Sequence, residues 1–303
     1  LAAPRKAPLF LMVSFYEPHS PFRYPVEFRD KYRPDEFSVP VAGPEDDAQI
    51  PAIFRDLTDD DKRGILASYY TSTEYLDKNV GIVLDALDHS GLGPNTLVAY
   101  TGDHGYMLGQ HGRFEKHCSY EPAVRSPLVM RVPGVTRENS STRALVEFVD
   151  IVPTVLESCG LEVPSAVQGR SLRRVLSGRS DRHRDHVIVE YAQNDEVMIR
   201  DDRWKLVYER GRRTRTDGYD PGRPLPGPTF RLFDLAADPD ELRNLAGEAA
   251  HAGRVEHYTR LLVEHLRQTA RRPELIPAAD DPLEILDFCV QPRDADSNPA
   301  RTK

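Results

Sequence analysis

The pattern of apolar and polar residues differs along the chain, and its longest regular stretch, with an apolar residue every three or four positions, predicts a helix. From Thr58 to Gly91, apolar side chains return every three or four positions along one stripe. Thr58 is suited to cap this helix, with Asp61 three residues later as the matching acidic partner, and Gly91 is suited to end it. The stripe consists of Ile65, Tyr69, Leu76, Val80, Val83 and Leu87.

Shorter apolar runs predict strands. Residues 8–15 are almost continuously apolar, which is typical of a strand buried on both faces. Residues 95–101 and 128–132 predict two more strands, with a short helix between them near Tyr120, and Asp150 opens a helical pattern that stops at residue 160. Strands and helices in this order favour a parallel α/β sheet flanked by helices.

The pattern changes near residue 180. Short β-like runs then follow one another and a helical pattern covers residues 255–270, which indicates a smaller α+β unit with an antiparallel sheet. We therefore expect an α/β part in residues 1–180, a small α+β domain in 181–272, and a polar tail or arm in 273–303. The β-like runs are residues 187–191, 196–200, 204–208 and 230–235.

Composition excludes several classes of protein. The chain has 303 residues, of which 39% are hydrophobic and 29% charged, as in ordinary globular proteins. A formal net charge of -8 argues against a nucleic-acid-binding surface, which needs a basic excess. No window approaches the length of apolar sequence that spans a bilayer, so we expect no membrane span. The 3 cysteines are too few and scattered for a disulfide framework or a zinc site.

The glycine-rich run of residues 101–112 carries the strongest chemical signal. Asp103 and His104 stand just beyond a predicted strand, where α/β sheets usually bind their ligands. A carboxylate oxygen and an imidazole nitrogen side by side can bind a divalent cation. Alternatively, Asp103 caps the next turn and His104 only packs, and the dipeptide alone does not decide between these interpretations.

Three more residues are expected at the same edge of the sheet. His19 lies in a proline-rich loop after the first predicted strand, Lys116 follows the glycine-rich run, and Arg125 precedes the next strand. A metal site, a histidine and a lysine that converge would suit a tetrahedral oxyanion. Each residue alone has an ordinary explanation, since loop histidines often bond locally and most lysines are solvated. Their combination is the stronger indication.

With these residues considered together, the chain resembles the C-terminal portion of a type I sulfatase of the alkaline phosphatase superfamily, over residues 8–250. The His after Asp103 and the run Pro-Phe-Arg-Tyr-Pro (residues 21–25) are most similar to the iduronate-2-sulfatase-like branch, although Asp-His also occurs in phosphonate monoester hydrolases. The matching motifs, in order, are Pro-His-x-Pro-Phe (18–22), Tyr-Leu-Asp-x-x-Val-Gly (75–81), Asn-Thr-Leu-Val (95–98), Asp-His-Gly (103–105), Lys116, Glu-x-x-x-Arg-x-Pro-Leu (121–128), Pro-Gly (133–134), Asp-Ile-Val-Pro-Thr (150–154), Leu-Phe-Asp-Leu (232–235), Asp-Pro (238–239) and Asn-Leu (244–245).

The resemblance implies a fold and a set of roles. It implies an alkaline phosphatase-like α/β sheet flanked by helices, with its N-terminal part missing, and a smaller C-terminal α+β domain. Asp103 and His104 would bind one divalent cation, with calcium favoured and manganese or magnesium as alternatives. His19 would contact the sulfate and the departing oxygen, and Lys116 would bind sulfate oxygens. His111 and His117 would be second-tier candidates, for which a structural or loop-orienting role is favoured.

The family also uses a formylglycine nucleophile, made from a Cys/Ser-x-Pro/Ala-x-Arg motif, and an acidic pair of metal ligands, both upstream of the motifs seen here. Cys289 starts a near match, with its proline one position late, and Ser297 starts a literal match in the polar tail that we attribute to chance. We therefore expect the nucleophile on a missing upstream segment and the chain alone to be inactive. The basic residues 210–215 favour a solvated hairpin loop over a guide for anionic glycans.

The expected activity is hydrolysis of a small-molecule or glycan sulfate ester. A phosphonate monoester or phosphodiester hydrolase of the same superfamily is the second interpretation. A non-catalytic remnant or anion-binding module is the third. The sequence leaves the particular ester, the compartment and the oligomeric state open.

Overall fold

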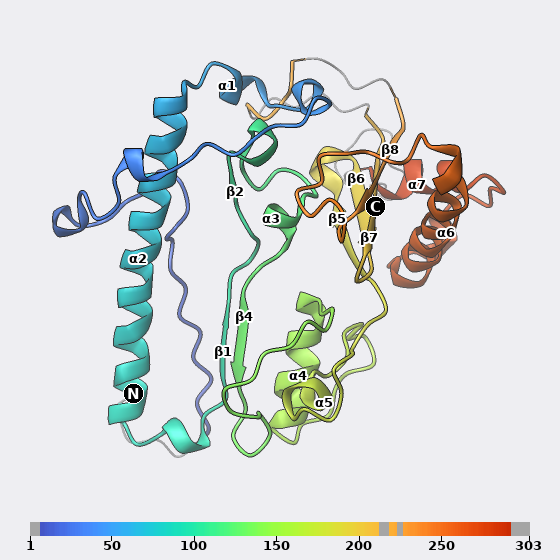
Figure 1. Ribbon diagram of the computed structural model, residues 1–303. Coiled ribbons are helices and arrows are strands. Elements are labelled where there is room, and N and C mark those ends of the chain that lie inside the picture. The colour runs from blue at the N-terminus through green and yellow to red at the C-terminus, as the bar shows by residue number, and fades with distance from the viewer. Residues whose placement is uncertain (1–6, 212–217, 223–226, 292–303) are drawn as a thin grey trace.

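The computed structural model describes residues 7–211, 218–222 and 227–291. Figure 1 shows the long helix α2 (Asp59–His89) along one side and the paired strands β1 (Val98–Thr101) and β4 (Leu128–Arg131) in the middle. A four-stranded sheet lies on the opposite side, with two C-terminal helices beyond it. Shorter 3-10 turns connect these parts: Val26–Phe28, Pro34–Glu36, Asp46–Ala48, Gly93–Asn95, Gln110–Gly112, Phe148–Asp150, Ala192–Asn194, Ala249–His251 and Pro273–Leu275.

Helix α2 begins at the expected cap. The Thr58 hydroxyl accepts a hydrogen bond from the Asp61 amide at 3.2 Å, and the Asp61 carboxylate accepts one from the Thr58 amide at 2.9 Å. The reciprocal pair satisfies two amides that the helix itself leaves unbonded. Gly91 has a φ of 73° just after the helix, a conformation that glycine adopts without strain. The sequence prediction of this helix is confirmed. The preceding short helix α1 covers Ala52–Arg55.

Strands β1 and β4 pair antiparallel, with Val98 opposite Arg131 and Thr101 opposite Leu128. The expectation that they form part of a parallel ladder is wrong for this pair. A parallel pair needs a crossover connection, usually a helix of several turns. The connecting residues 102–127 are all described and contain only the four-residue helix α3 (Glu121–Val124) and a hairpin of β2 (Met107–Leu108) with β3 (Phe114–Glu115). The chain therefore returns beside β1 in the opposite direction.

Residues 8–15 form no strand, contrary to the sequence prediction. In Figure 1 this segment runs between α2 and β1, and its side chains are exposed, with Phe10 at 84% and Met12 at 77%. A strand with apolar residues on both faces needs covering layers on both sides. No strand of the described residues pairs with this segment, so it lacks the cover that the prediction assumed.

Asp150 precedes α4 (Ile151–Ser158), as expected, but its side chain does not cap that helix. The carboxylate is fully buried and accepts hydrogen bonds from the amides of Glu147 and Arg170 and from the Arg184 guanidinium. It therefore joins α4 to the segments before and after the short helix α5 (Arg173–Leu176).

The C-terminal sheet has the order β5-β6-β7-β8 and is antiparallel throughout, as the sequence predicted. Its inner strands are the most buried part of the described structure: Val197, Ile199, Leu206 and Tyr208 are all 0% exposed. Helix α6 (Ala252–Thr269) covers this core through Leu262 and its neighbours. The strands are β5 (Val187–Tyr191), β6 (Glu196–Arg200), β7 (Trp204–Glu209) and β8 (Thr229–Asp234).

Helix α7 (Pro282–Cys289) lies within the range expected to be a polar arm. Ile285, Leu286 and Val290 are between 0% and 4% exposed and belong to the same core as β6, β7 and α6. The expectation is therefore wrong for this segment, because a few apolar residues suffice to dock a short helix whose surroundings in the sequence are polar. Residues 292–303 lie outside the described residues.

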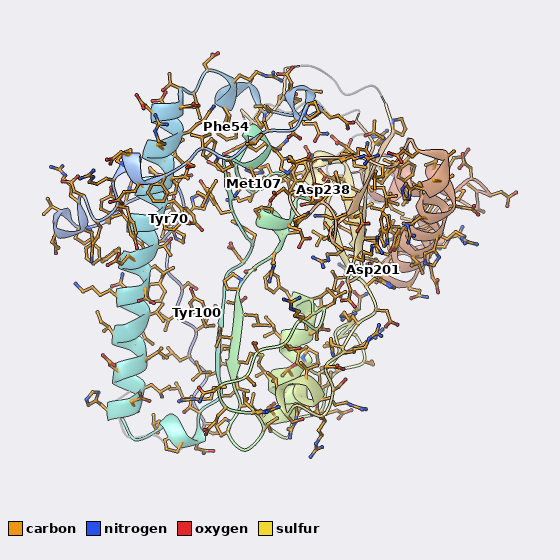
Figure 2. The ribbon with its side chains drawn as sticks, viewed as in Figure 1. Phe54, Tyr70, Tyr100, Met107, Asp201 and Asp238 are labelled. Atoms are coloured by element: carbon orange, nitrogen blue, oxygen red, sulfur yellow. The ribbon has the colours of Figure 1, made fainter. Side chains whose placement is uncertain are left out.

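Burial is uneven over the molecule. Met107 and Phe54 lie where the β2–β3 hairpin meets the first helices, and both are buried, whereas Tyr100 on β1 is 39% exposed (Figure 2). The β1–β4 ladder is thus less covered than the C-terminal sheet. Among the described helices, none combines the length and the apolar character that a bilayer crossing requires.

Candidate active site

Lys116 and His19 are in direct contact although 97 positions separate them. The Lys116 Nζ lies 2.9 Å from His19 Nε2, and His19 Nδ1 lies 2.6 Å from the carbonyl oxygen of Ser20. A carbonyl oxygen only accepts hydrogen bonds, so Nδ1 is the donor and carries the proton. Nε2 is then the acceptor for the Lys116 ammonium. The geometry thus assigns one neutral tautomer to His19 in this contact.

Asp103 and His104 lie side by side just after β1. The Asp103 side chain is 88% exposed, and its Oδ1 lies 3.4 Å from His104 Nε2. His104 Nδ1 donates to the carbonyl oxygen of Gly105 at 2.6 Å, so Nε2 is the ring nitrogen that faces the Asp103 carboxylate. A carboxylate oxygen and an imidazole nitrogen side by side can bind a divalent cation once that nitrogen has lost its proton.

These two residues supply part of a metal site. Calcium takes about six to eight oxygen ligands and other divalent cations also need more than two donors. In the residues that the structure describes, no cluster of three or more His, Cys, Asp or Glu side chains forms a metal site. Asp103 and His104 are therefore suitable as two ligands among several.

One cavity brings the predicted residues together. Asp103, His104 and Lys116 all line it, and His19 reaches the same place through its contact with Lys116. Arg125, the other candidate of the sequence, also lines this cavity. The cavity has a volume of about 2500 Å³ and many other residues line it as well, so the convergence of these residues on one catalytic site stays a prediction.

His111 lies away from the cavity wall, in the interior. It is 2% exposed, its Nδ1 lies 3.0 Å from both carboxylate oxygens of Asp46, and its ring stacks on Tyr120 with centroids 3.6 Å apart. Burial alone would raise the pKa of Asp46, but the hydrogen bond and charge of His111 bring that pKa below its usual value. This environment supports the structural role favoured for His111.

His117 lines the cavity but is tied to its neighbours. Its Nδ1 contacts the Tyr191 hydroxyl at 2.5 Å, and its ring centroid lies 3.8 Å from that of Tyr219. Its Nε2 lies 3.7 Å from the carboxylate of Glu115. These contacts support a role in orienting the loop around Lys116.

Sequence reasoning missed Glu115. Its carboxylate accepts hydrogen bonds from Ser20 Oγ at 3.1 Å and from the Tyr219 hydroxyl. The neighbouring His117 imidazole is the main reason that the pKa of Glu115 is lowered to about 2, with the hydrogen bonds from Tyr219 and Ser20 acting in the same direction. The partners Ser20 and Tyr219 are 95 and 104 positions away, so no local motif could have indicated the cluster.

The first 161 residues match the family model described as Sulfatase. The chain belongs to the sulfatase family. A second family model, described as N-sulphoglucosamine sulphohydrolase, C-terminal, matches residues 109–269. The family membership inferred from the ordered motifs is thereby confirmed.

Curated sulfatases from distant organisms are similar to the chain. It is 27% identical to an arylsulfatase of Clostridium perfringens over 274 residues, which cover 86% of this chain and 53% of the relative. It is 31% identical to a choline-sulfatase of Rhizobium meliloti over 259 residues, or 80% of this chain and 47% of the relative. The mouse iduronate 2-sulfatase is 34% identical over 203 residues, which cover 52% of this chain and 37% of the relative. The chain spans about half the length, or less, of these curated relatives.

Solved structures confirm the fold class. The phosphonate monoester hydrolase of Agrobacterium radiobacter superposes with a TM-score of 0.74 at 25% identity, over 91% of this chain and 60% of that one. A protein solved with its substrate D-glucosamine-2-N,6-O-disulfate superposes with a TM-score of 0.61 at 29% identity, over 70% of this chain and 42% of that one. The chain thus has the α/β fold of the sulfatases in the alkaline phosphatase superfamily.

Neither of the two weak matches to the formylglycine motif, at Cys289 and Ser297, gains support from the structure. Cys289 lies in α7 and is partly buried, and burial raises the pKa of its thiol to about 11, so little reactive thiolate is present near neutral pH. Ser297 lies outside the described residues, as do residues 212–215 of the basic run.

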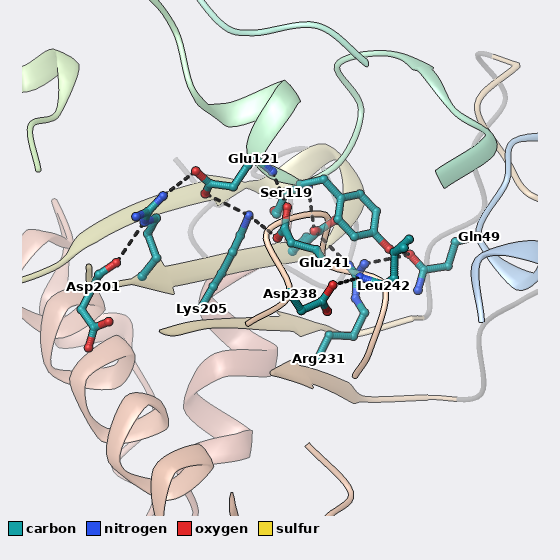
Figure 3. A network of polar contacts seen from close by, with 12 residues as sticks. Gln49, Ser119, Glu121, Asp201, Lys205, Arg231, Asp238, Glu241 and Leu242 are labelled. Atoms are coloured by element: carbon teal, nitrogen blue, oxygen red, sulfur yellow. Dashed lines mark hydrogen bonds and ion pairs between the residues drawn. The ribbon is translucent and has the colours of Figure 1, made fainter. Parts of the chain in front are cut away.

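A buried ionic network connects the site segment to the C-terminal sheet (Figure 3). Lys205 on β7 is 0% exposed, and its Nζ lies 2.7 Å from Glu241 and 3.3 Å from Glu121. The Glu121 amide donates to Glu241 at 2.6 Å, and Arg200 on β6 contacts the Glu121 carboxylate. Helix α3 begins at Glu121, which lines the cavity, so the sheet holds one wall of the candidate site in place.

Proposed function

We propose that the protein to which this chain contributes hydrolyses sulfate esters by a metal-assisted formylglycine mechanism. One observation carries the proposal: Lys116 and His19 meet at 2.9 Å beside a cavity that Asp103 and His104 also line. Membership of the sulfatase family supports this assignment of the reaction.

Lys116 would bind the sulfate oxygens. Its ammonium is a compact charge with three donors, so it can stabilise the oxygens on which negative charge develops as the S–O bond breaks. In the described contact one of those donors is given to His19 Nε2. A bound sulfate would compete for that donor and leave His19 Nε2 able to carry a proton.

His19 would donate this proton to the departing oxygen. Hydrolysis breaks the bond between sulfur and the ester oxygen, and the alcohol leaves with both electrons of that bond and one proton. An imidazole titrates near neutral pH and can supply the proton from Nε2. The hydrogen bond from Nδ1 to Ser20 fixes the ring so that Nε2 faces the Lys116 side of the site.

Asp103 and His104 would be two ligands of the divalent cation, with calcium favoured over manganese or magnesium. When bound, the cation would neutralise the charge of the ester and favour attack by an oxygen nucleophile. The remaining ligands and the formylglycine would lie on a segment of the protein outside this chain, which spans about half of its curated relatives. The 303-residue chain alone should then show negligible turnover.

The substrate would be a small-molecule or glycan sulfate ester. Relatives named for such esters include an N-acetylglucosamine-6-O-sulfatase of Bacteroides thetaiotaomicron, 30% identical over 213 residues, and the choline-sulfatase. A phosphonate monoester hydrolase is the second candidate, because such an enzyme superposes with a TM-score of 0.74.

The experiment compares 4-nitrophenyl sulfate with 4-nitrophenyl phenylphosphonate as substrates of the full-length protein. We expect a higher kcat/KM for the sulfate, and a dominant phosphonate activity would favour the second candidate. Lys116→Ala should lower kcat/KM by at least about tenfold, since a lost charge-stabilising donor has effects of this size or more. Lys62→Ala on the surface of α2 is the matched control. Turnover by the 303-residue chain alone would contradict the placement of the nucleophile outside it.

A further inference from the structure

Glu115 joins three segments that are far apart in the sequence. It is the last residue of β3 and directly precedes Lys116. Its carboxylate accepts hydrogen bonds from Ser20 Oγ at 3.1 Å and from the Tyr219 hydroxyl, and His117 Nε2 lies 3.7 Å away. One side chain thus connects the N-terminal loop, the segment after β3 and the short stretch around residue 219.

The contact with Ser20 runs beside the contact between Lys116 and His19. Ser20 follows His19 directly, just as Lys116 follows Glu115, so the same two segments are joined twice. A single contact leaves the two segments free to rotate about it, whereas a second one fixes their relative orientation. Supporting hydrogen bonds of this kind keep reacting groups in a productive geometry.

The backbone at Glu115 is specialised for this arrangement. Its φ is 71°, in the left-handed region that few residues other than glycine adopt. Such conformations persist where surrounding contacts enforce them, and they gather at functional sites. Here the turn lets successive residues face different partners, with Glu115 bonded to Ser20 and Lys116 placed at the cavity wall.

We propose that Glu115 is a positioning residue that holds His19 and Lys116 in register through its hydrogen bonds to Ser20 and Tyr219. The inference rests on the proposed function of His19 and Lys116 and adds the residue that sets their geometry. The carboxylate is suited to this task because its lowered pKa, about 2, keeps it a charged acceptor at any pH at which a sulfatase would be assayed.

The first experiment is a double-mutant cycle in the full-length protein with an aryl sulfate. Glu115→Ala should lower kcat at least about tenfold and change KM less, because displacement of reacting groups mainly raises the barrier. In a Lys116→Ala background the same substitution should change kcat by less than about twofold, since the contact that Glu115 maintains is already absent. Ser20→Ala should give an intermediate loss. Glu157→Ala, which removes an exposed carboxylate on α4, is the matched control.

The second experiment does not depend on turnover. Nitrogen-15 NMR of the histidine rings should show His19 as the single tautomer protonated at Nδ1, with its signals identified by their loss in His19→Gln. Glu115→Ala should give a mixture of tautomers, because Nε2 then loses its fixed donor. If Glu115→Ala fails to fold, Ser20→Ala and Tyr219→Phe each remove one donor to the carboxylate and leave the fold otherwise unchanged.

If Glu115→Ala lowers kcat by the same factor in the wild-type protein and in the Lys116→Ala variant, Glu115 only supports the fold. An unchanged His19 spectrum in the Glu115 variants would overturn the proposal as well. A full-length wild-type protein that hydrolyses no sulfate ester would instead refute the proposed function, and the NMR comparison would still decide the role of Glu115.

Discussion

Replacing Lys205 by methionine would leave the buried Glu241 carboxylate without its cation, whereas Glu121 would keep its ion pair with Arg200. Lys205 is 0% exposed on β7, and its Nζ lies 2.7 Å from Glu241 and 3.3 Å from Glu121. Glu241 is itself 2% exposed, so water cannot replace the lost partner. Methionine has nearly the length of lysine, and the substitution therefore removes the charge with little change in packing.

The expected loss of stability is large. At an effective dielectric constant of about 20, opposite charges 2.7 Å apart attract by about 6 kcal/mol. Desolvation offsets much of that attraction in the intact pair, but removal of one partner from a buried pair typically costs about 3–5 kcal/mol. With an m-value of about 3 kcal/mol per molar, the urea midpoint should fall by about 1–2 M.

Urea unfolding followed by the fluorescence of Trp204 measures this shift, since Trp204 is the single tryptophan of the sequence and precedes Lys205 on β7. Lys62→Met is the control, because its ion pair with Asp59 is solvated and should contribute at most about 1 kcal/mol. Adding Glu241→Gln to Lys205→Met should recover part of the loss. A midpoint shift no larger than that of Lys62→Met would refute the reasoning.

Three further predictions concern the metal, the pH and the long helix. Asp103→Ala should weaken calcium binding by the full-length protein in calorimetry, and an unchanged affinity would exclude Asp103 as a ligand. The pKa of Glu115 is lowered to about 2 from 4.5, so its contribution to stability is complete above about pH 4.5 and is lost as the pH falls towards 2. The difference in urea midpoint between wild type and Glu115→Gln should therefore shrink from pH 6 to about pH 3, and a constant difference would contradict the assignment. Thr58→Ala removes the cap of α2 and should cost about 1 kcal/mol in the same assay, whereas no cost would show that the cap is dispensable.

Elements with a clear local signal could be predicted from the sequence. The cap and the apolar stripe of α2 involve residues only three or four positions apart, so the pattern contains the whole cause of the helix. The runs of β5 and β6 were predicted with the bounds that the structure gives. These strands alternate with turns over short distances, which makes the antiparallel pairing a local property as well.

Elements whose burial depends on residues far away in the sequence were predicted less well. The run of residues 8–15 has the composition of a buried strand, but burial requires neighbours that no described strand provides. Helix α7 shows the opposite case. Its neighbours in the sequence are polar, so a polar tail was predicted, although a few of its side chains pack in the same core as α6. Neither outcome could be read from the segment itself.

Short motifs in the sequence mark some residues of the candidate site. Asp103, His104 and Lys116 occur in short runs that the family shares, and the structure places all three on one cavity. Glu115 has no such mark, because its role comes from side chains about a hundred positions away. A motif thus identifies the residues that would do the chemistry more readily than those that align them.

The 97 positions between His19 and Lys116 have a consequence for the order in which the protein folds. The hydrogen bonds of helix α2 join residues close together in the sequence, so the helix can form early. The contact between His19 and Lys116 instead requires closure of a loop that contains the whole of α2. The contacts of Ser20 and Tyr219 with Glu115 close loops of similar length. During synthesis and refolding, the chain should therefore form helix α2 well before its candidate active site. In refolding of the full-length protein, recovered helix content would then precede recovered activity.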